Sequence, residues 1–299
     1  MAPLLPPVLR PVPKPSPRPW AGSSLGDGIG ELWLAGPDST VVLAQGVATL
    51  DDLALSSGAP LVGTRGMERL GARFPLLVKL IDAGDWLSLQ VHPSDAVARR
   101  IHGSEAIGKA EAWLVLDADP GALLVTGPRA GLAASELRAK VAAGSLDRDD
   151  CSAQPATAGD VLHLPAGTIH AIGAGTFVYE IEQPSDLTYR ISDWGRPPVP
   201  GRRLHTAEAL EAVDAGQRAV PCGTGWVLTG GSLAVPEFKL EILGPGGSHA
   251  RNPGGETPEV VSVVGGSASL VSEGWQEQIA PNEALVVTAA CGAYRIEAA

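Results

Sequence analysis

The sequence predicts a mainly β fold, arranged as two barrels with short helical insertions. Three observations predict it. Turn residues recur throughout, with 37 Gly and 26 Pro among 299 residues. The segments between them are short and rich in Val, Leu and Ile, as in all-β sandwiches and barrels. A Pro- and Arg-rich stretch near residue 200 also separates two such series of strands, which indicates a domain boundary there.

Eight strands are predicted in the first two thirds of the chain, each a run of aliphatic residues between turns. They span residues 41–44, 76–82, 87–91, 112–117, 123–126, 160–164, 176–183 and 187–191. Two short helices are predicted between these strands. Residues 95–101 follow Ser94, which can cap a helix, and residues 135–143 begin at the candidate cap Ser135.

The second series of strands follows a linker. Residues 201–220 have linker composition, with one short helix predicted over residues 206–213. Shorter strands are then predicted at residues 226–228, 238–243, 259–264, 268–271, 284–288 and 294–297. The expected organisation is therefore a first barrel with helical insertions over residues 1–200, the linker, and a second, degenerate barrel over residues 221–299.

Charge and composition narrow the class of partner. A formal charge of −11 disfavours nucleic acid and anionic membranes, because both attract clustered Lys and Arg. No apolar run is long enough to span a membrane, and the Pro-rich start lacks the apolar core of a secretory signal. Cys151, Cys222 and Cys291 are far apart and odd in number, which argues against a disulfide framework. We therefore expect a cytoplasmic protein, as a monomer or homodimer, that supplies positive charge to any anionic substrate locally.

Two stretches place polar side chains on one face of a predicted strand. In residues 87–93, alternation puts Ser88, Gln90 and His92 on one side and apolar residues on the other. The same period puts Glu111 on the side of Lys109. An amide, an imidazole and a carboxylate can all bind metal. Taken alone, however, Lys109 and Glu111 favour a solvated strand edge over a pocket.

Residues 159–170 shift that balance toward a metal site. They follow the pattern Gly, five residues, Pro, any residue, Gly, two residues, His, which is the second sequence motif of the cupin (jelly-roll) barrels. The Pro-x-Gly turn folds one strand back, so that His170 is expected to point into the barrel toward Gln90 and His92. Two imidazoles, one carboxylate and one amide oxygen suit Zn²⁺, with other divalent metals as replacements, and leave positions open for water or substrate. We predict one such ion in the first barrel and none in the second.

Five segments resemble a known family and occur in its order along the chain. They are residues 77–82, 87–93, 108–113, 165–175 and 185–196. Together they resemble the type I mannose-6-phosphate isomerases in their shorter bacterial form. The resemblance implies zinc ligands at Gln90, His92, Glu111 and His170, an active-site arginine at Arg190, and pocket residues at Lys79, Ser88, Lys109 and Glu180.

The reaction implied by this resemblance interconverts mannose 6-phosphate and fructose 6-phosphate through an enediol. A proton moves between adjacent carbons, and the developing oxyanion must be stabilised. The hypothesis is that Zn²⁺ orients the sugar oxygens and that Arg190 stabilises the enediolate. Lys109 with Glu180 would then handle proton transfer and ring opening, while Lys79 and Ser88 orient the sugar or its phosphate. Two alternatives stay open: a cupin metalloenzyme of another class, such as an oxygenase or epimerase, and a sugar-binding cupin without turnover.

Overall fold

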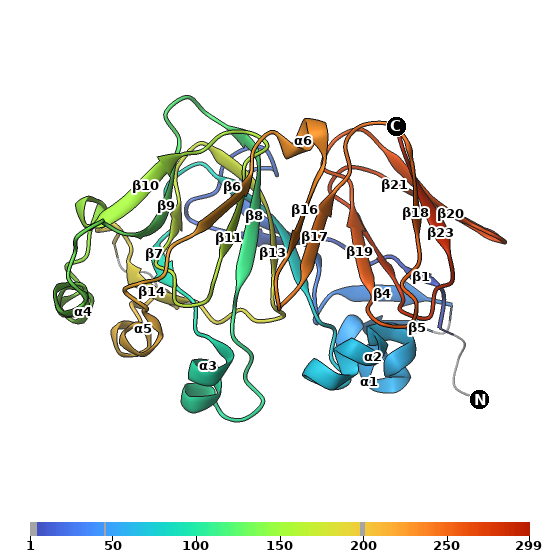
Figure 1. The fold of residues 1–299 in the computed structure, drawn as a ribbon, viewed down its shortest axis with the longest axis horizontal. Helices are drawn as coiled ribbons and strands as arrows, with labels where there is room; N and C mark the ends of the chain where they lie inside the picture. Colours follow the sequence, from blue (N-terminus) through green and yellow to red (C-terminus); the bar gives the residue numbers. More distant parts are fainter. Residues whose placement is uncertain (1–4, 45, 198–200) are drawn as a thin grey trace.

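The computed structural model describes residues 5–44, 46–197 and 201–299. Residues 1–4, at the Pro-rich start, and residues 198–200, at the end of the predicted first domain, lie outside the described residues. The chain is mainly β, as predicted, and two groups of strands lie side by side (Figure 1). Within the described ranges, no helix combines the length and apolar character that crossing a bilayer requires.

A seven-stranded antiparallel sheet runs through the middle of the molecule. Its order is β15, β11, β8, β13, β6, β3, β2, with bounds Val220–Gly223, Val161–Leu164, Glu111–Ala118, Thr176–Glu182, Leu77–Ala83, Ile29–Ala35 and Lys14–Pro17. The strands β6, β8 and β13 are buried along most of their length. Strands covered on both faces read as continuous apolar runs with a few polar residues, which is why β6 and β8 could be predicted from the sequence.

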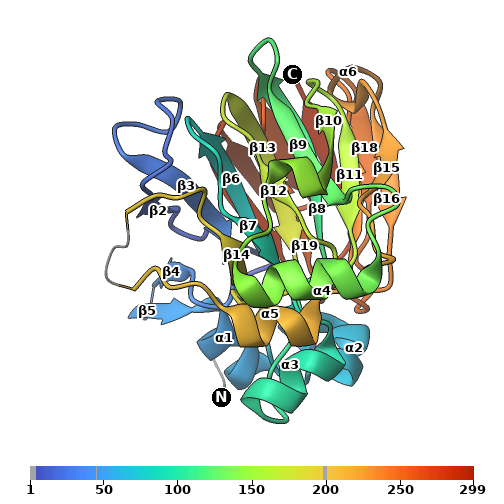
Figure 2. The ribbon, with the colours of Figure 1, turned by 90° about the vertical axis from the view of Figure 1, so that its left-hand side faces the viewer.

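Shorter strands form a second layer facing this sheet (Figure 2). They are β10, β9 and β12 (Cys151–Pro155, Leu123–Pro128 and Ala171–Ile172) and the pair β14 and β7 (Tyr189–Ser192 and Leu89–Val91). The two parts are joined at Gln90 and His170, whose backbones exchange two N–H···O bonds of 3.0 Å. The second layer therefore brings these two predicted ligands next to each other.

The strands at the other side of the molecule come from both ends of the chain (Figure 1). β1 pairs with β22, which pairs with β19 (Val8–Leu9, Ala284–Val287 and Glu259–Ser262). A four-stranded sheet holds β18, β23, β20 and β21 (Ser248–Arg251, Tyr294–Ala298, Ala268–Ser272 and Trp275–Ile279). Two hairpins are β4 with β5 (Thr40–Leu43 and Gly46–Thr49) and β16 with β17 (Gly231–Ala234 and Lys239–Ile242).

One predicted strand is wrong. Residues 226–228 belong to the short helix α6, Trp226–Thr229. The Trp226 indole folds back onto Gly223 and Gly231, where a Cβ atom would lie within 2.1 Å of its ring atoms. With the indole in this position, neither glycine has room for a side chain.

Three of the other helices were predicted from the sequence, and the rest were not. Helix α3, Asp95–His102, begins at Ser94, whose Oγ accepts from Val97 N as predicted. Helix α4 spans Ala134–Ala143, but its N-cap is Ala133 and Ser135 lies inside the helix, so the predicted cap is wrong. Helix α5 spans Thr206–Ala212. Unpredicted are α1, Leu50–Ser57, α2, Ala59–Leu70, and the 3₁₀ turn Arg148–Asp150.

The two faces of the central sheet have different partners. Leu114, Tyr179 and Ile181 belong to an apolar core that also contains Phe238 and Leu240 of the C-terminal strands. Because side chains alternate along a strand, their sequence neighbours point the opposite way, into the barrel. That inner face carries the candidate site.

Candidate metal centre

The inner face of the sheet carries two adjacent rows of charged and aromatic side chains. In the first row, Glu180 lies opposite Lys79 on β6 and opposite Trp113 on β8. In the second, Glu182 lies opposite Glu111. Directly opposed residues on neighbouring strands have side chains on the same face. The alternation of β13 therefore brings Glu180 and Glu182 to the same interior as Glu111.

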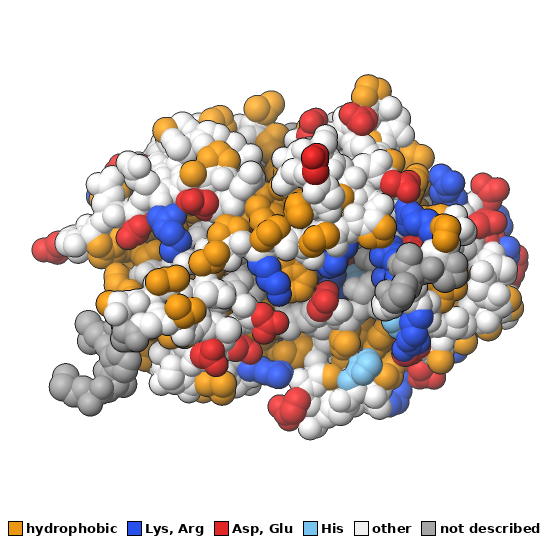
Figure 3. Space-filling model, turned by 180° about the vertical axis from the view of Figure 1, so that it is seen from behind, with side chains coloured by type: hydrophobic (Ala, Val, Ile, Leu, Met, Phe, Trp, Pro, Cys, Tyr) orange, Lys and Arg blue, Asp and Glu red, His pale blue; other side chains and the backbone are white. Residues whose placement is uncertain are grey.

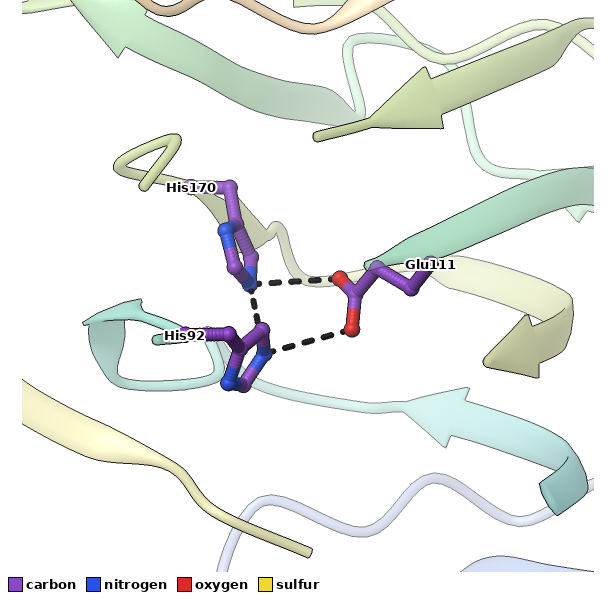
Figure 4. A group of neighbouring side chains, drawn as sticks. All are labelled: His92, Glu111 and His170. Atoms are coloured by element: carbon purple, nitrogen blue, oxygen red, sulfur yellow. Dashed lines mark hydrogen bonds and ion pairs between the residues drawn. The ribbon is translucent and has the colours of Figure 1, made fainter. Parts of the chain in front are cut away.

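His92 and His170 approach Glu111 from the facing layer (Figure 4). Their Nε2 atoms lie 3.1 Å apart, Glu111 Oε2 is 3.2 Å from Nε2 of His92, and Glu111 Oε1 is 3.2 Å from Nε2 of His170. All three side chains are at least 98 % buried. Glu111 Oε1 has no hydrogen-bond partner among the described residues.

The hydrogen bonds of the two Nδ1 atoms determine whether each Nε2 carries a proton or a free lone pair. Nδ1 of His92 lies 2.9 Å from the Leu187 carbonyl oxygen, and Nδ1 of His170 lies 2.9 Å from that of Thr168. A carbonyl accepts only, so each Nδ1 carries the proton and each neutral ring presents an Nε2 lone pair. Burial lowers the pKa of His92 to about 4, with the Lys109 ammonium acting in the same direction. Two lone pairs and a carboxylate then face one another, which is a donor set that can hold a metal ion.

The spacing of these donors fits a divalent metal. Donors about 2.0–2.1 Å from a tetrahedral zinc lie roughly 3.3 Å from one another, close to the 3.1 and 3.2 Å observed. The carbonyls that hold Nδ1 are the usual outer partners of metal-binding histidines. Burial, the largest single influence, raises the pKa of Glu111, but Lys109 and the two histidines outweigh it and hold the pKa well below its ordinary value. The residues therefore fit the predicted ion.

Gln90 and Ser88 complete this side of the site. The Gln90 side-chain nitrogen is 3.2 Å from His170 Nε2, and its oxygen accepts from Ser88 Oγ at 3.3 Å. An amide is nearly symmetric in shape, so a half-turn exchanges its oxygen and nitrogen. After that half-turn the oxygen faces the histidines, as metal binding requires, and the NH₂ group donates to Ser88 Oγ. Ser88 thus contacts a candidate ligand in both orientations.

The two predicted pocket lysines share a carboxyl group that the sequence analysis did not single out. Glu182 is fully buried; its Oε1 lies 2.8 Å from Lys79 Nζ and its Oε2 lies 2.7 Å from Lys109 Nζ. Lys109 Nζ is also 2.8 Å from Glu111 Oε2 and 3.2 Å from His92 Nε2. The period-2 spacing of Glu180 and Glu182 was the available signal, since two acids alternating with apolar residues share a face.

Burial and pairing act in opposite directions on these groups. Burial, the largest influence, lowers the pKa of Lys109, but Glu111 and Glu182 outweigh it and hold the pKa well above its ordinary value. Burial raises the pKa of Glu182 well above its ordinary value, although the ammonium groups of Lys109 and Lys79 oppose that shift. Glu180 accepts from Trp113 Nε1 at 2.9 Å and lies 3.5 Å from Lys79 Nζ. Both lysines are therefore charged, and the carboxyl groups of Glu111, Glu180 and Glu182 surround them.

Arg190 lies in the same layer as Gln90 but outside the cluster of converging donors. It is paired with Gln90 across β14 and β7. Its backbone N–H donates to His205 Nδ1 at 3.1 Å, its carbonyl accepts from His205 N at 2.8 Å, and Nη1 donates to the Arg203 carbonyl at 2.9 Å. Within the described residues its Nε has no partner. Arg190 is thus fixed through its backbone and keeps part of its guanidinium available.

A second group missed by the sequence analysis lies beside Lys79. Arg18 donates to both oxygens of Glu31 at 2.9 and 2.8 Å, and Trp33 Nε1 donates to Glu31 Oε2 at 2.8 Å. Lys79 Nζ lies 4.9 Å from the centre of the Trp33 ring. This arrangement extends the charged inner face from β13 and β6 to β3.

Comparisons with known proteins agree with this architecture. The family description "Phosphomannose isomerase type I, catalytic domain" matches residues 23–110. A mannose-6-phosphate isomerase of Streptococcus mutans is 43% identical over 148 residues, which is 49% of this chain and 46% of that protein. The Bacillus subtilis protein named "Probable mannose-6-phosphate isomerase GmuF" is 32% identical over 240 residues, covering 76% of this chain and 73% of that protein. The chain thus spans about half the length of the first of these relatives and nearly three quarters of the second.

Two solved structures share the fold over nearly the whole chain. The mannose 6-phosphate isomerase from B. subtilis has a TM-score of 0.76 and 24% identity, with 97% of this chain and 96% of that chain covered. A structure described as "mannose 6-phosphate isomerase (holo; zinc bound)" has a TM-score of 0.73 and 15% identity, with 97% of both chains covered.

The fold and the buried histidine–glutamate cluster define a cupin-type barrel with a candidate metal centre inside it. Within that class, the sequence identity to the B. subtilis protein GmuF, over nearly three quarters of its length, identifies one family. The chain belongs to the type I mannose-6-phosphate isomerase family.

Proposed function

We propose that this protein is a metal-dependent aldose–ketose isomerase that interconverts mannose 6-phosphate and fructose 6-phosphate. The observation that carries the proposal is the convergence of two neutral imidazole nitrogens and a buried carboxylate at 3.1–3.2 Å beside two buried lysines. Membership of the family supports the choice of substrate, and the zinc-bound relative supports the choice of metal.

Gln90, His92, Glu111 and His170 are the proposed ligands of one Zn²⁺ ion per chain. When bound, the ion supplies a Lewis acid that polarises the sugar oxygens and stabilises negative charge on them. Gln90 enters this set through its oxygen after the half-turn of its amide. The donors are nitrogen and oxygen atoms without thiolate, so other divalent metals can replace zinc.

The remaining residues are proposed to handle the proton and the developing charge. Aldose–ketose interconversion removes a proton from one carbon and returns it to the next, so a base within hydrogen-bond reach of those carbons is needed. Lys109 and Glu180 are the proposed proton-transfer pair, and Arg190 is proposed to stabilise the enediolate with the donors of its guanidinium. Lys79 and Ser88 are proposed to orient the sugar or its phosphate.

The surface supports a phosphorylated substrate. The chain has a net charge of −11, yet several Lys and Arg side chains lie near one another toward the right of Figure 3. Arg202 and Arg18 lie near enough to Arg190 to influence its pKa, which burial and these two cations lower. Arg18 and Arg202 also face the carboxylates of Glu31 and Asp193. The positive charge left for an anion is therefore mainly that of Arg190, whose Nε has no partner among the described residues.

Fructose 6-phosphate formation tests the proposal. Purified protein is treated with a chelator, reloaded with Zn²⁺ and supplied with mannose 6-phosphate in an assay coupled to fructose 6-phosphate consumption. We expect turnover in the loaded protein, loss of most of it after chelation, and recovery on adding metal. Metal-replete protein that forms no fructose 6-phosphate would overturn the proposed function.

Two variants separate metal binding from chemistry. Glu111→Gln should lose both bound zinc and turnover, because it removes the charged ligand. Arg190→Ala should retain zinc and lose most turnover, on the order of 100-fold, as expected for a lost donor to an oxyanion. Loss of zinc from Arg190→Ala would show that this arginine has a structural role instead.

The setting of the activity is proposed to be the cytoplasm, with the protein as a monomer or homodimer. The three cysteines are unpaired, as expected in a reducing compartment. Light scattering coupled to gel filtration distinguishes the two oligomeric states.

A further inference from the structure

Glu182 lies between Lys79 and Lys109 and has no role in the function proposed above. Its carboxyl group is fully buried, and each of its oxygens contacts a different ammonium group, at 2.8 Å for Lys79 and 2.7 Å for Lys109. Both contacts are ion pairs, and neither Glu182 oxygen has a hydrogen-bond partner among the described residues. Its contacts point to an effect on the lysines.

Lys109 competes for the atoms that are proposed to bind zinc. Its Nζ lies 2.8 Å from Glu111 Oε2 and 3.2 Å from His92 Nε2. A neutral imidazole whose Nδ1 carries the proton has one lone pair, on Nε2. That lone pair can accept a hydrogen bond from Lys109 or bind a metal ion, but not both. Loading of the ion therefore requires the ammonium group to release His92.

From this geometry we infer that Glu182 is a positioning residue: it gives the Lys109 ammonium group a partner outside the ligand set, so that this group can leave His92 when the ion binds. The inference rests on the proposed metal centre. Glu182 Oε2 is the shortest of the three contacts of Lys109 Nζ, at 2.7 Å, and it lies on the adjacent strand rather than in the ligand set. When the ion binds, Lys109 keeps this partner, so releasing His92 does not leave a buried ammonium group unpaired, which would be strongly destabilising.

A pair of matched comparisons tests whether Glu182 acts through Lys109. The affinity of apo protein for Zn²⁺ is measured by competition with a chelating dye in four variants: Lys79→Met, Lys79→Met/Glu182→Gln, Lys109→Met and Lys109→Met/Glu182→Gln. Each pair removes the same carboxyl group from a pocket with one lysine. The pairs differ only in whether the lysine that remains is Lys109, so an effect of charge alone is the same in both.

The expected result is a difference between the pairs. With Lys109 present, the Glu182→Gln change should weaken zinc binding roughly 10- to 100-fold, the range seen for outer partners of metal ligands. With Lys109 absent, the same change should alter the affinity by no more than about threefold, because the competing ammonium group is gone. Equal losses in the two pairs would overturn the inference.

Two controls keep the outcome interpretable. Circular dichroism checks that each variant is folded. If the Lys79→Met pair does not fold, the parent protein and its Glu182→Gln variant, which both contain Lys109, take its place. Parent protein that binds no zinc would instead mean that the proposed metal centre is wrong, whereas zinc binding by the parent with equal losses in both pairs refutes only the role of Glu182.

Discussion

Glu31 shows how a single buried carboxylate is kept charged beside the site. It is 8 % exposed and accepts two hydrogen bonds from Arg18 and one from Trp33. Burial, the largest influence, raises the pKa of Glu31, but Lys79 and Arg18 together outweigh it and lower the pKa to about 2. A carboxyl group with a lowered pKa binds protons less readily in the folded than in the unfolded chain, so it stabilises the fold above its unfolded pKa.

This pairing predicts a specific loss of stability in acid. The contribution of Glu31 is complete above about pH 5 and disappears as the pH falls toward 2, and a lowering from 4.5 to about 2 corresponds to about 3 kcal/mol. Between those limits, the free energy of unfolding of the parent should fall by about that much more than that of Glu31→Gln. Urea unfolding at several pH values measures both. Parallel pH profiles for the two proteins would contradict the prediction.

The sequence predicted some site residues and not others for a physical reason. Gln90 and His92 share a face because a strand alternates, and His170 follows a turn with a fixed spacing, so both are local signals. The Arg18–Glu31 pair depends on the register between β2 and β3, which shifts between Ser16 and Pro17. A register shift of that kind is decided by tertiary packing and leaves no mark in the spacing of residues.

At the scale of elements, the segment before β8 ties the strand of Glu111 to that of His92. Gly108 N donates to Asp95 Oδ1 at 2.8 Å, and Lys109 N donates to the Pro93 carbonyl at 2.9 Å. A Cβ atom on Gly108 would lie 2.5 Å from Asp95 N. The absence of a side chain at this glycine is what allows the two segments to touch.

Replacing this glycine should therefore disturb both stability and metal binding. We expect Gly108→Ala to lower the free energy of unfolding by about 1–3 kcal/mol, the usual cost of forcing an extra carbon into a packed site. It should also weaken zinc binding, because Lys109 and Glu111 move relative to His92. Thermal unfolding and dye competition measure the two effects.

Gly292→Ala is the matched control for that variant, since a Cβ there meets nothing within 4 Å and the backbone needs no left-handed conformation. It should leave stability and zinc affinity unchanged. Zinc affinity in Gly108→Ala equal to that of the control would show that the segment does not position Glu111.

Helix α2 illustrates why some elements escaped prediction. It is kinked at Gly63, whose backbone is non-helical (φ 78°, ψ 168°), and it also contains Gly66, where glycine costs up to about 1 kcal/mol in a helix. The helix is held from outside: Thr64 N donates to the Gly255 carbonyl at 2.9 Å, and Gly63 lies so close to Glu256 that a Cβ atom would be 2.1 Å from its carbonyl oxygen. Helix α1, by contrast, has a capping box of Thr49 and Asp52 that the sequence displayed.

At the scale of the whole molecule, the central sheet packs against different parts of the chain on its two faces. Its inner face carries the site, and its outer face joins the core that contains Phe238 and Leu240. The N-terminal strand β1 also crosses to pair with β22, from Val8 to Val287. Contacts between residues so distant in sequence have no local signature, so the sequence predicted two series of strands but not how they pack together. The division into domains at residues 201–220 stays a prediction.

Because the C-terminal strands cover the outer face of the sheet that carries the site, a substitution that weakens their packing should also weaken the metal centre. Phe238 packs in the shared core and lies edge-on to His163 of β11, with ring centres 6.5 Å apart. Its ring also borders a cavity of about 1110 Å³. Truncation should therefore cost about 3 kcal/mol, at the lower end for phenylalanine, because part of its surroundings is already open.

We expect Phe238→Ala to unfold in one transition at a lower temperature than the parent, with zinc release and loss of circular dichroism shifted together. Leu228→Ala, which truncates a side chain that is 75 % exposed on α6, should shift neither signal. Two separate transitions in Phe238→Ala, with zinc release at the parent's temperature, would mean that the barrel holds its metal ligands without help from the C-terminal strands. A single transition instead follows if the outer face of β8 and β13 must stay covered for Glu111 and Glu182 to keep their places on the inner one.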